Sequence, residues 1–157
     1  MSPNRKRSFS AVVAVSLLAL AAGGGAVAAT KAEQTIAARQ AGYKQIGGAF
    51  KAINDQLKSG SPDTRLIAAN AKTIHDLSLK APSWFPKGSG PEAGVKTKAK
   101  AEIWTDSAKF AAAMKTFQTE SAKLQQVAAK GDVGAIQAQV RAVGGSCGGC
   151  HKPFREE

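Results

Sequence analysis

The stretch VGAIQAQVRAVGGSCGGCHKPFR, residues 133–155, carries the pattern that decides the fold. Its larger buried-type side chains recur every three or four positions, at Val133, Ile136, Val140, Val143, Cys147 and Cys150. This spacing puts them on one face of an α-helix, because a helix completes a turn every 3.6 residues. A strand would alternate with a period of two, and the sequence has no convincing run of that kind. We therefore predict a long amphipathic helix with both cysteines on its buried face.

Three earlier segments show the same periodicity, over residues 31–58, 62–80 and 107–130. Ser61 is the predicted N-cap of the second segment, with Pro62 at its first helical position. A loop rich in proline and glycine, residues 81–102, separates the second segment from the third. Four long helices with apolar stripes predict an all-α fold, an antiparallel four-helix bundle. The stripes contain much Ala and Gly, which leaves room in the core for another group.

The composition limits the classes of protein to consider. The chain has 157 residues, enough for one domain, and its 43% hydrophobic content supports a core. It carries 22 Lys and Arg against 11 Asp and Glu, a formal net charge of +11. These cations are scattered and seldom lie beside aromatic residues, which argues against nucleic-acid binding. The charge instead predicts attraction to acidic proteins or anionic surfaces.

The N-terminus has the features of a secretory signal peptide. Arg5, Lys6 and Arg7 precede an apolar stretch over residues 9–22, and small residues at Ala26 and Ala28 fit a cleavage site. We predict cleavage after about Ala28, a mature domain of residues 29–157 and a periplasmic location. The alternative is an uncleaved N-terminal anchor. No second apolar stretch follows, so no membrane span is expected in the mature chain.

The chemistry resides in Cys147, Gly148, Gly149, Cys150 and His151, a C-x-x-C-H motif typical of c-type haem attachment. Two thiols three positions apart lie on the same side of a helical turn, where each can add to one vinyl group of a porphyrin. The adjacent His151 is then placed to ligate the iron. The chain has only two cysteines, and both lie in this motif. We predict one covalently attached haem c, with Cys147 and Cys150 as attachment sites and His151 as axial ligand.

Three other interpretations of the motif remain open. A thioredoxin-like thiol oxidoreductase would use Cys147 and Cys150 but normally has a βαβ context. A zinc site needs four ligands, and His75 is the only other histidine. A disulfide between the two cysteines would close too small a ring to stabilise the chain much.

The sequence resembles the class II c-type cytochromes, and among them the cytochrome c′ family. The matching features are Arg39-Gln40, Gly47, Ile103-Trp104 and the C-terminal motif through Phe154-Arg155. The resemblance covers essentially all of residues 29–157. It implies a four-helix bundle with haem c between the helices and a homodimer formed through the first two helices. It also implies that Arg39 and Gln40 lie near the haem propionates, that Arg155 lies on the proximal side, and that Thr97 approaches the haem edge. A solvated surface position is the alternative for either arginine.

Tyr43 decides which branch of the family the chain resembles. Low-spin members have a methionine four residues after the arginine as sixth iron ligand, whereas this chain has Tyr43 there. The resemblance therefore implies a five-coordinate iron that binds NO or CO over Tyr43, with one-electron exchange with small redox proteins. No Ser/His/Asp or paired-carboxylate pattern stands out in the sequence, so no enzymatic activity is expected. The alternative is a six-coordinate electron carrier whose sixth ligand is Met114, His75 or Tyr43.

Overall fold

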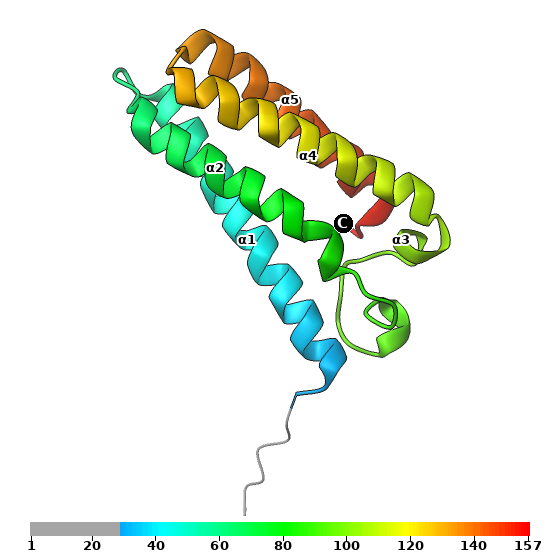
Figure 1. Cartoon of the computed structure of the whole chain (residues 1–157). Helices are drawn as coiled ribbons and strands as arrows, with labels where there is room; N and C mark the ends of the chain where they lie inside the picture. Colours follow the sequence, from blue (N-terminus) through cyan, green and yellow to red (C-terminus); the bar gives the residue numbers. More distant parts are fainter. Residues whose placement is uncertain (1–28) are drawn as a thin grey trace, which may run out of the picture.

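The structure, a computed structural model, describes residues 29–157. Its four long helices are α1 (Lys31–Lys58), α2 (Thr64–Lys80), α4 (Ser107–Lys130) and α5 (Val133–Phe154). Successive long helices run in opposite directions, and the C-terminus lies at the same end of the bundle as the long loop after α2 (Figure 1). The predicted all-α, antiparallel four-helix bundle is confirmed. Within the described range the only β-type pairing is an isolated bridge between Ala99 and Arg155.

The start of α2 differs from the prediction. The helix begins at Thr64 and its N-cap is Asp63. The Asp63 carboxylate accepts hydrogen bonds from the backbone N–H groups of Arg65, at 2.9 Å, and Leu66, at 3.2 Å. The predicted cap, Ser61, was therefore wrong by two residues. A carboxylate at the N-cap binds free N–H groups and also interacts favourably with the positive end of the helix dipole, which favours Asp63.

The turn between α4 and α5 consists of Gly131 and Asp132. Gly131 ends α4 in the left-handed conformation with φ of 75°, and Asp132 caps α5 by accepting from the N–H of Ala135 at 3.0 Å. Glycine pays no Cβ penalty in that conformation, so the two helices reverse direction over two residues. This tight turn brings α5 back along α4.

The loop between α2 and α4 is longer and more structured than the other connections. It contains two 3₁₀ turns, η1 (Ala81–Trp84) and η2 (Pro91–Ala93), and the single-turn helix α3 (Glu102–Thr105). The Trp104 Nε1–H donates to the carbonyl oxygens of Phe85 and Pro86, both at 3.2 Å. The loop is thereby folded over one end of the bundle.

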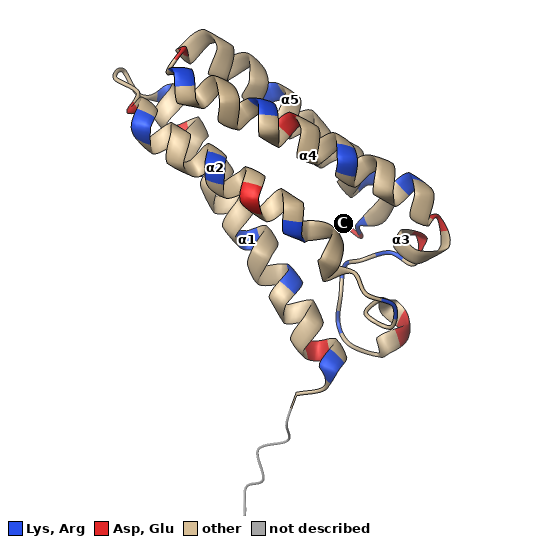
Figure 2. Cartoon of the chain, viewed as in Figure 1, with Lys and Arg blue, Asp and Glu red and all other residues tan. Residues whose placement is uncertain are grey.

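The core has two apolar clusters. The larger one fills the bundle with Ile, Leu, Val and Ala side chains, including the fully buried Ile53, Ile67, Ile74 and Leu124. The smaller one lies under the loop and includes Phe110, Met114 and Phe154. Lys and Arg are spread over all the long helices (Figure 2). No helix in residues 29–157 meets the length and hydropathy needed to cross a bilayer.

Candidate functional site

A cavity of about 700 Å³ opens between α1, α4, α5 and the loop at the end of the bundle that holds the C-terminus. This volume falls within the range of cofactor and ligand sites. Its wall is mainly apolar and includes Ile46, Phe50, Phe85, Phe110, Phe117 and Val143. Its charged lining residues are all cationic: Arg39, Lys44, Lys98 and Arg155. The cavity therefore suits a large apolar group that also carries negative charge.

The C-terminal turns of α5 bring the motif to this cavity. Cys147, Cys150 and His151 all line it, and the two thiols are free and partly buried. Burial raises the pKa of Cys147, and it raises that of Cys150 to about 11. Burial, and secondarily the Arg155 cation, lowers the pKa of His151, which keeps the imidazole neutral and able to bind a metal. Two protonated thiols and a neutral imidazole on one wall fit covalent haem attachment.

Arg39 lies on the opposite wall and is only 4% exposed, so the solvated alternative is wrong for this residue. Its Nη2 donates to the Ser89 carbonyl at 2.9 Å and to the Thr97 hydroxyl at 3.0 Å. Its guanidinium also lies 4.7 Å from the centre of the Phe85 ring. Burial lowers its pKa, yet an arginine remains charged at neutral pH. No carboxylate within residues 29–157 pairs with it, so this buried cation faces the cavity ready for an anionic group.

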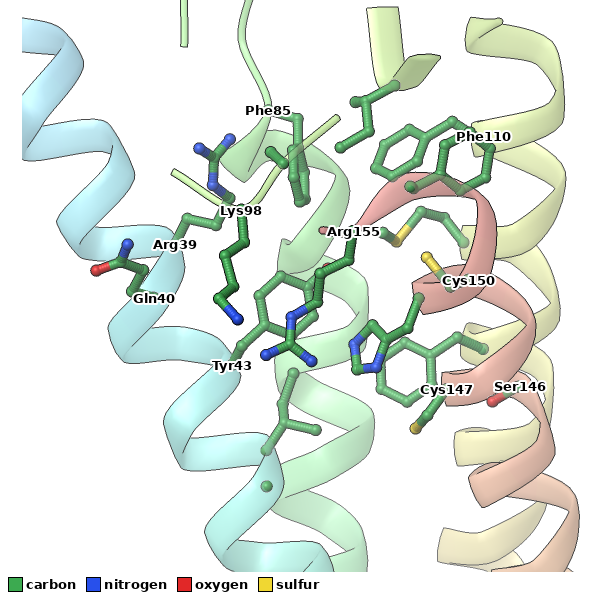
Figure 3. A pocket seen from close by; sticks show the side chains of 18 of the residues that line it. Arg39, Gln40, Tyr43, Phe85, Lys98, Phe110, Ser146, Cys147, Cys150 and Arg155 are labelled. Atoms are coloured by element: carbon green, nitrogen blue, oxygen red, sulfur yellow. The ribbon is translucent and has the colours of Figure 1, made fainter. Parts of the chain in front are cut away.

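Tyr43 is partly buried and faces the helix that carries Cys147 and Cys150 (Figure 3). Its ring meets those of Trp84, with centroids 5.2 Å apart, and Phe85, with centroids 6.2 Å apart. Burial raises its pKa well above the usual value for tyrosine. Tyr43 therefore places a neutral phenol beside the cavity.

The other predicted positions divide into two groups. Gln40, Thr97 and Arg155 line the cavity, with Arg155 exposed at its mouth. Of the alternative iron ligands, Met114 lines the cavity and is 3% exposed, whereas His75 does not line it. His75 instead lies between α2 and α4, with Nδ1 3.4 Å from the Ser121 hydroxyl. The described residues contain no group of three or more side chains suited to a bare metal ion, which removes support from the zinc alternative.

The sequence did not reveal several residues of the site. Ser89 binds Arg39 from the loop, Phe85 stacks against it, and Lys98 lies at the cavity wall. Residues 98–100 also pair with the end of α5, since Lys100 N–H donates to the Phe154 carbonyl at 3.0 Å and Glu156 N–H to the Lys98 carbonyl at 2.8 Å. No periodic spacing marks these loop residues. The length of the loop is the sequence signal that could have pointed to a site there.

Comparison with known proteins places the chain in a family. The family model for cytochrome c′ matches residues 34–155. The chain belongs to the cytochrome c′ family. Proteins of this family carry one covalently bound haem c, and the cavity fits such a group through its thiols, its imidazole and its unpaired buried arginine.

Individual relatives agree with this assignment. A cytochrome c′ from Rhodospirillum rubrum is 38% identical over 109 residues, which cover 69% of this chain and 72% of the relative. A nitric oxide complex of a cytochrome c prime variant from Alcaligenes xylosoxidans has a TM-score of 0.73 at 29% identity, covering 82% of this chain and 98% of that one. A cytochrome c′ with ligand-controlled dimer dissociation has a TM-score of 0.76 at 25% identity, covering 83% of this chain and all of that one.

Proposed function

We propose that this protein is a periplasmic haem c protein with a five-coordinate iron, which exchanges single electrons and binds NO or CO. The observation that carries the proposal is Tyr43. It takes the place of a methionine ligand and presents a neutral phenol to the cavity opposite the helix of His151. A neutral phenol is a poor iron ligand. Haem c, when bound, supplies an iron that changes oxidation state by one electron and has a coordination position free for a diatomic gas.

Each proposed role follows from where the side chain lies. Cys147 and Cys150 form the two thioether links, and His151 provides the protein ligand to iron. Arg39 is buried with hydrogen bonds to neutral groups only, so it pairs with a propionate carboxylate. Gln40, Thr97 and Arg155 border the same cavity and complete its polar contacts.

Two alternatives can be weighed against the same geometry. A thiol oxidoreductase needs a low-pKa cysteine, whereas burial raises the pKa of both thiols here. A six-coordinate carrier needs a sixth ligand that binds iron strongly, and among the named alternatives Met114 and Tyr43 line the cavity whereas His75 does not. Met114 packs within the smaller core cluster, where its flexible side chain has an ordinary filling role. We therefore rank the five-coordinate protein first.

The wider setting of the protein is part of the same proposal. The cations at the cavity favour small redox proteins with acidic surfaces as partners, and the site offers no arrangement typical of an enzyme. A homodimer through α1 and α2 is part of the proposal, and Leu79 on α2, which is 58% accessible, is a candidate contact. The dimeric behaviour of one similar cytochrome c′ supports it further. The predicted signal peptide lies outside the described residues.

Optical spectra of the purified haem-loaded protein test the proposal. We expect a broad high-spin Soret band after reduction with dithionite, which sharpens and shifts when CO is added. Sharp α and β bands that CO does not change would contradict the open coordination position and favour the six-coordinate carrier. A protein without a haem spectrum, expressed together with haem-attachment machinery, would overturn the haem assignment itself.

A further inference from the structure

Gly42 forms a notch in the surface of α1, and the ring of Trp84 fills it. A Cβ at position 42 would lie 2.6 Å from Cζ2 and 2.7 Å from Cζ3 of Trp84, and nearer still to Cη2. Real Cβ atoms do not approach other atoms so closely, so only glycine admits the ring at this depth. Trp84 is the last residue of η1, the 3₁₀ turn that directly follows α2.

The same Trp84 ring contacts the residue next to the notch. The Tyr43 and Trp84 rings meet edge to face, with centroids 5.2 Å apart and an angle of 82° between their planes. Phe85 lies near the Tyr43 ring as well, with centroids 6.2 Å apart. Edge-to-face contacts of this kind stabilise a ring pair beyond the gain from burial.

No hydrogen bond holds the Tyr43 hydroxyl within the described part of the chain, so packing alone fixes the ring. Both Tyr43 and Trp84 touch the two core clusters and therefore lie at the junction between them. η1 itself is anchored by Ala81, which is fully buried. Trp84 is thus held by the bundle on one side and meets the cavity-lining tyrosine on the other.

We infer that Trp84, seated in the Gly42 notch, is a positioning residue that holds the Tyr43 ring at the cavity and so sets how fast a small ligand reaches the haem iron. The inference rests on the proposed function, because it assumes an open iron behind Tyr43. Trp84 itself does not line the cavity, so it acts only through Tyr43. A ring that loses its edge-to-face partner gains access to other rotamers, which opens the path to the iron.

CO association kinetics of the reduced, haem-loaded protein test this inference. We expect Trp84→Leu to raise the association rate constant roughly tenfold, which corresponds to a barrier lower by about 1.4 kcal/mol. In a Tyr43→Ala background the same substitution should leave the rate unchanged, because Trp84 then has no ring to position. Leu57→Ala is the control for lost packing, since Leu57 packs against the larger core cluster and does not line the cavity. We expect this control to keep the parental rate.

Trp84→Phe provides a milder variant in case the leucine variant folds poorly. It keeps an aromatic ring but lacks the outer atoms that fill the notch, and we expect an intermediate rise in rate. Gly42→Ala should lower the Tm of the parent, and this loss should shrink in the Trp84→Phe background, where the clash is absent. An equal loss of Tm in both backgrounds would overturn the inference that the Trp84 ring packs in the Gly42 notch.

The outcomes also separate this inference from the proposed function. A Trp84→Leu effect on CO association that persists without Tyr43 would overturn the positioning role while leaving the open iron intact. If the parent does not bind CO, the proposed function fails, and the crystal structure of the Trp84→Leu variant becomes the decisive measurement. A Tyr43 ring that keeps its parental position in that structure would refute the inference, and a displaced ring would support it.

Discussion

Arg39→Met is the substitution whose effect follows most directly from the structure. Methionine keeps much of the aliphatic stem of Arg39 but removes the buried guanidinium. The change breaks hydrogen bonds of 2.9 Å and 3.0 Å to Ser89 and Thr97, together with the contact to the Phe85 ring. It therefore releases the loop from α1 and removes the proposed partner of a propionate.

The expected loss of stability can be worked from these contacts. Hydrogen bonds from a charged donor contribute about 1.5–3 kcal/mol each, and the cation–π contact about 0.5–2 kcal/mol. Removing a buried charge also relieves its desolvation cost, which offsets part of this sum. We expect a net loss of about 3 kcal/mol. For a domain of this size that lowers the Tm by roughly 10 °C.

Thermal unfolding of the haem-loaded protein, followed by circular dichroism at 222 nm, measures this loss. Parent and variant are compared at equal protein concentration, because association changes the Tm. Arg141→Met is the control, since Arg141 is an exposed arginine on α5, and we expect its Tm to stay within about 2 °C of the parent. If Arg39→Met melted as the control does, the guanidinium would not be the anchor that joins the loop to α1.

Three further substitutions test other parts of the molecule. Tyr43→Met should supply the missing sixth ligand and give sharp low-spin bands. Optical titration should then show CO binding at least tenfold weaker, a loss of about 1.4 kcal/mol. Unchanged high-spin spectra would contradict the assignment of Tyr43 to the open face. Asp63→Ala should lower the free energy of unfolding, measured with a chemical denaturant, by about 1 kcal/mol, whereas Ser61→Ala should leave it almost unchanged. The reverse order would contradict the observed N-cap. Gly131→Ala should lower the free energy of unfolding by about 1 kcal/mol or more, because position 131 has a positive φ, and should leave the haem spectrum unchanged. An unchanged free energy of unfolding would mean that the turn relaxes easily.

The sequence was informative about the helices because their apolar stripes are long and their caps are distinct. The predicted bounds of α1 agree with the structure, and the third segment, predicted over residues 107–130, coincides with α4. The start of α2 was misplaced because Ser61 and Asp63 are both good caps only two residues apart. Which of them caps the helix depends on the backbone path after α1.

The residues around the cavity were harder to predict from sequence. Arg39 is buried because Ser89 and Thr97 receive its hydrogen bonds, and these residues are 50 and 58 positions away. Phe85 and Ser89 lie in a loop, where no periodicity relates a residue to its neighbours in space. The motif at residues 147–151 identified one wall of the site, whereas the opposite wall depends on tertiary contacts that local patterns do not encode.

The order in which the long helices pack has a consequence for folding kinetics. α1 packs mainly on α2, α2 on α4 and α4 on α5, whereas α1 and α5, which flank the cavity, touch little. Most contacts thus join helices that are consecutive long elements of the chain, which corresponds to a low contact order and to folding within microseconds to milliseconds. Bringing α1 and α5 together joins the two ends of the domain, so this step has the largest entropic cost of loop closure. We expect it to be the last step of folding. Until that step, Cys147 and Cys150 stay accessible to a porphyrin.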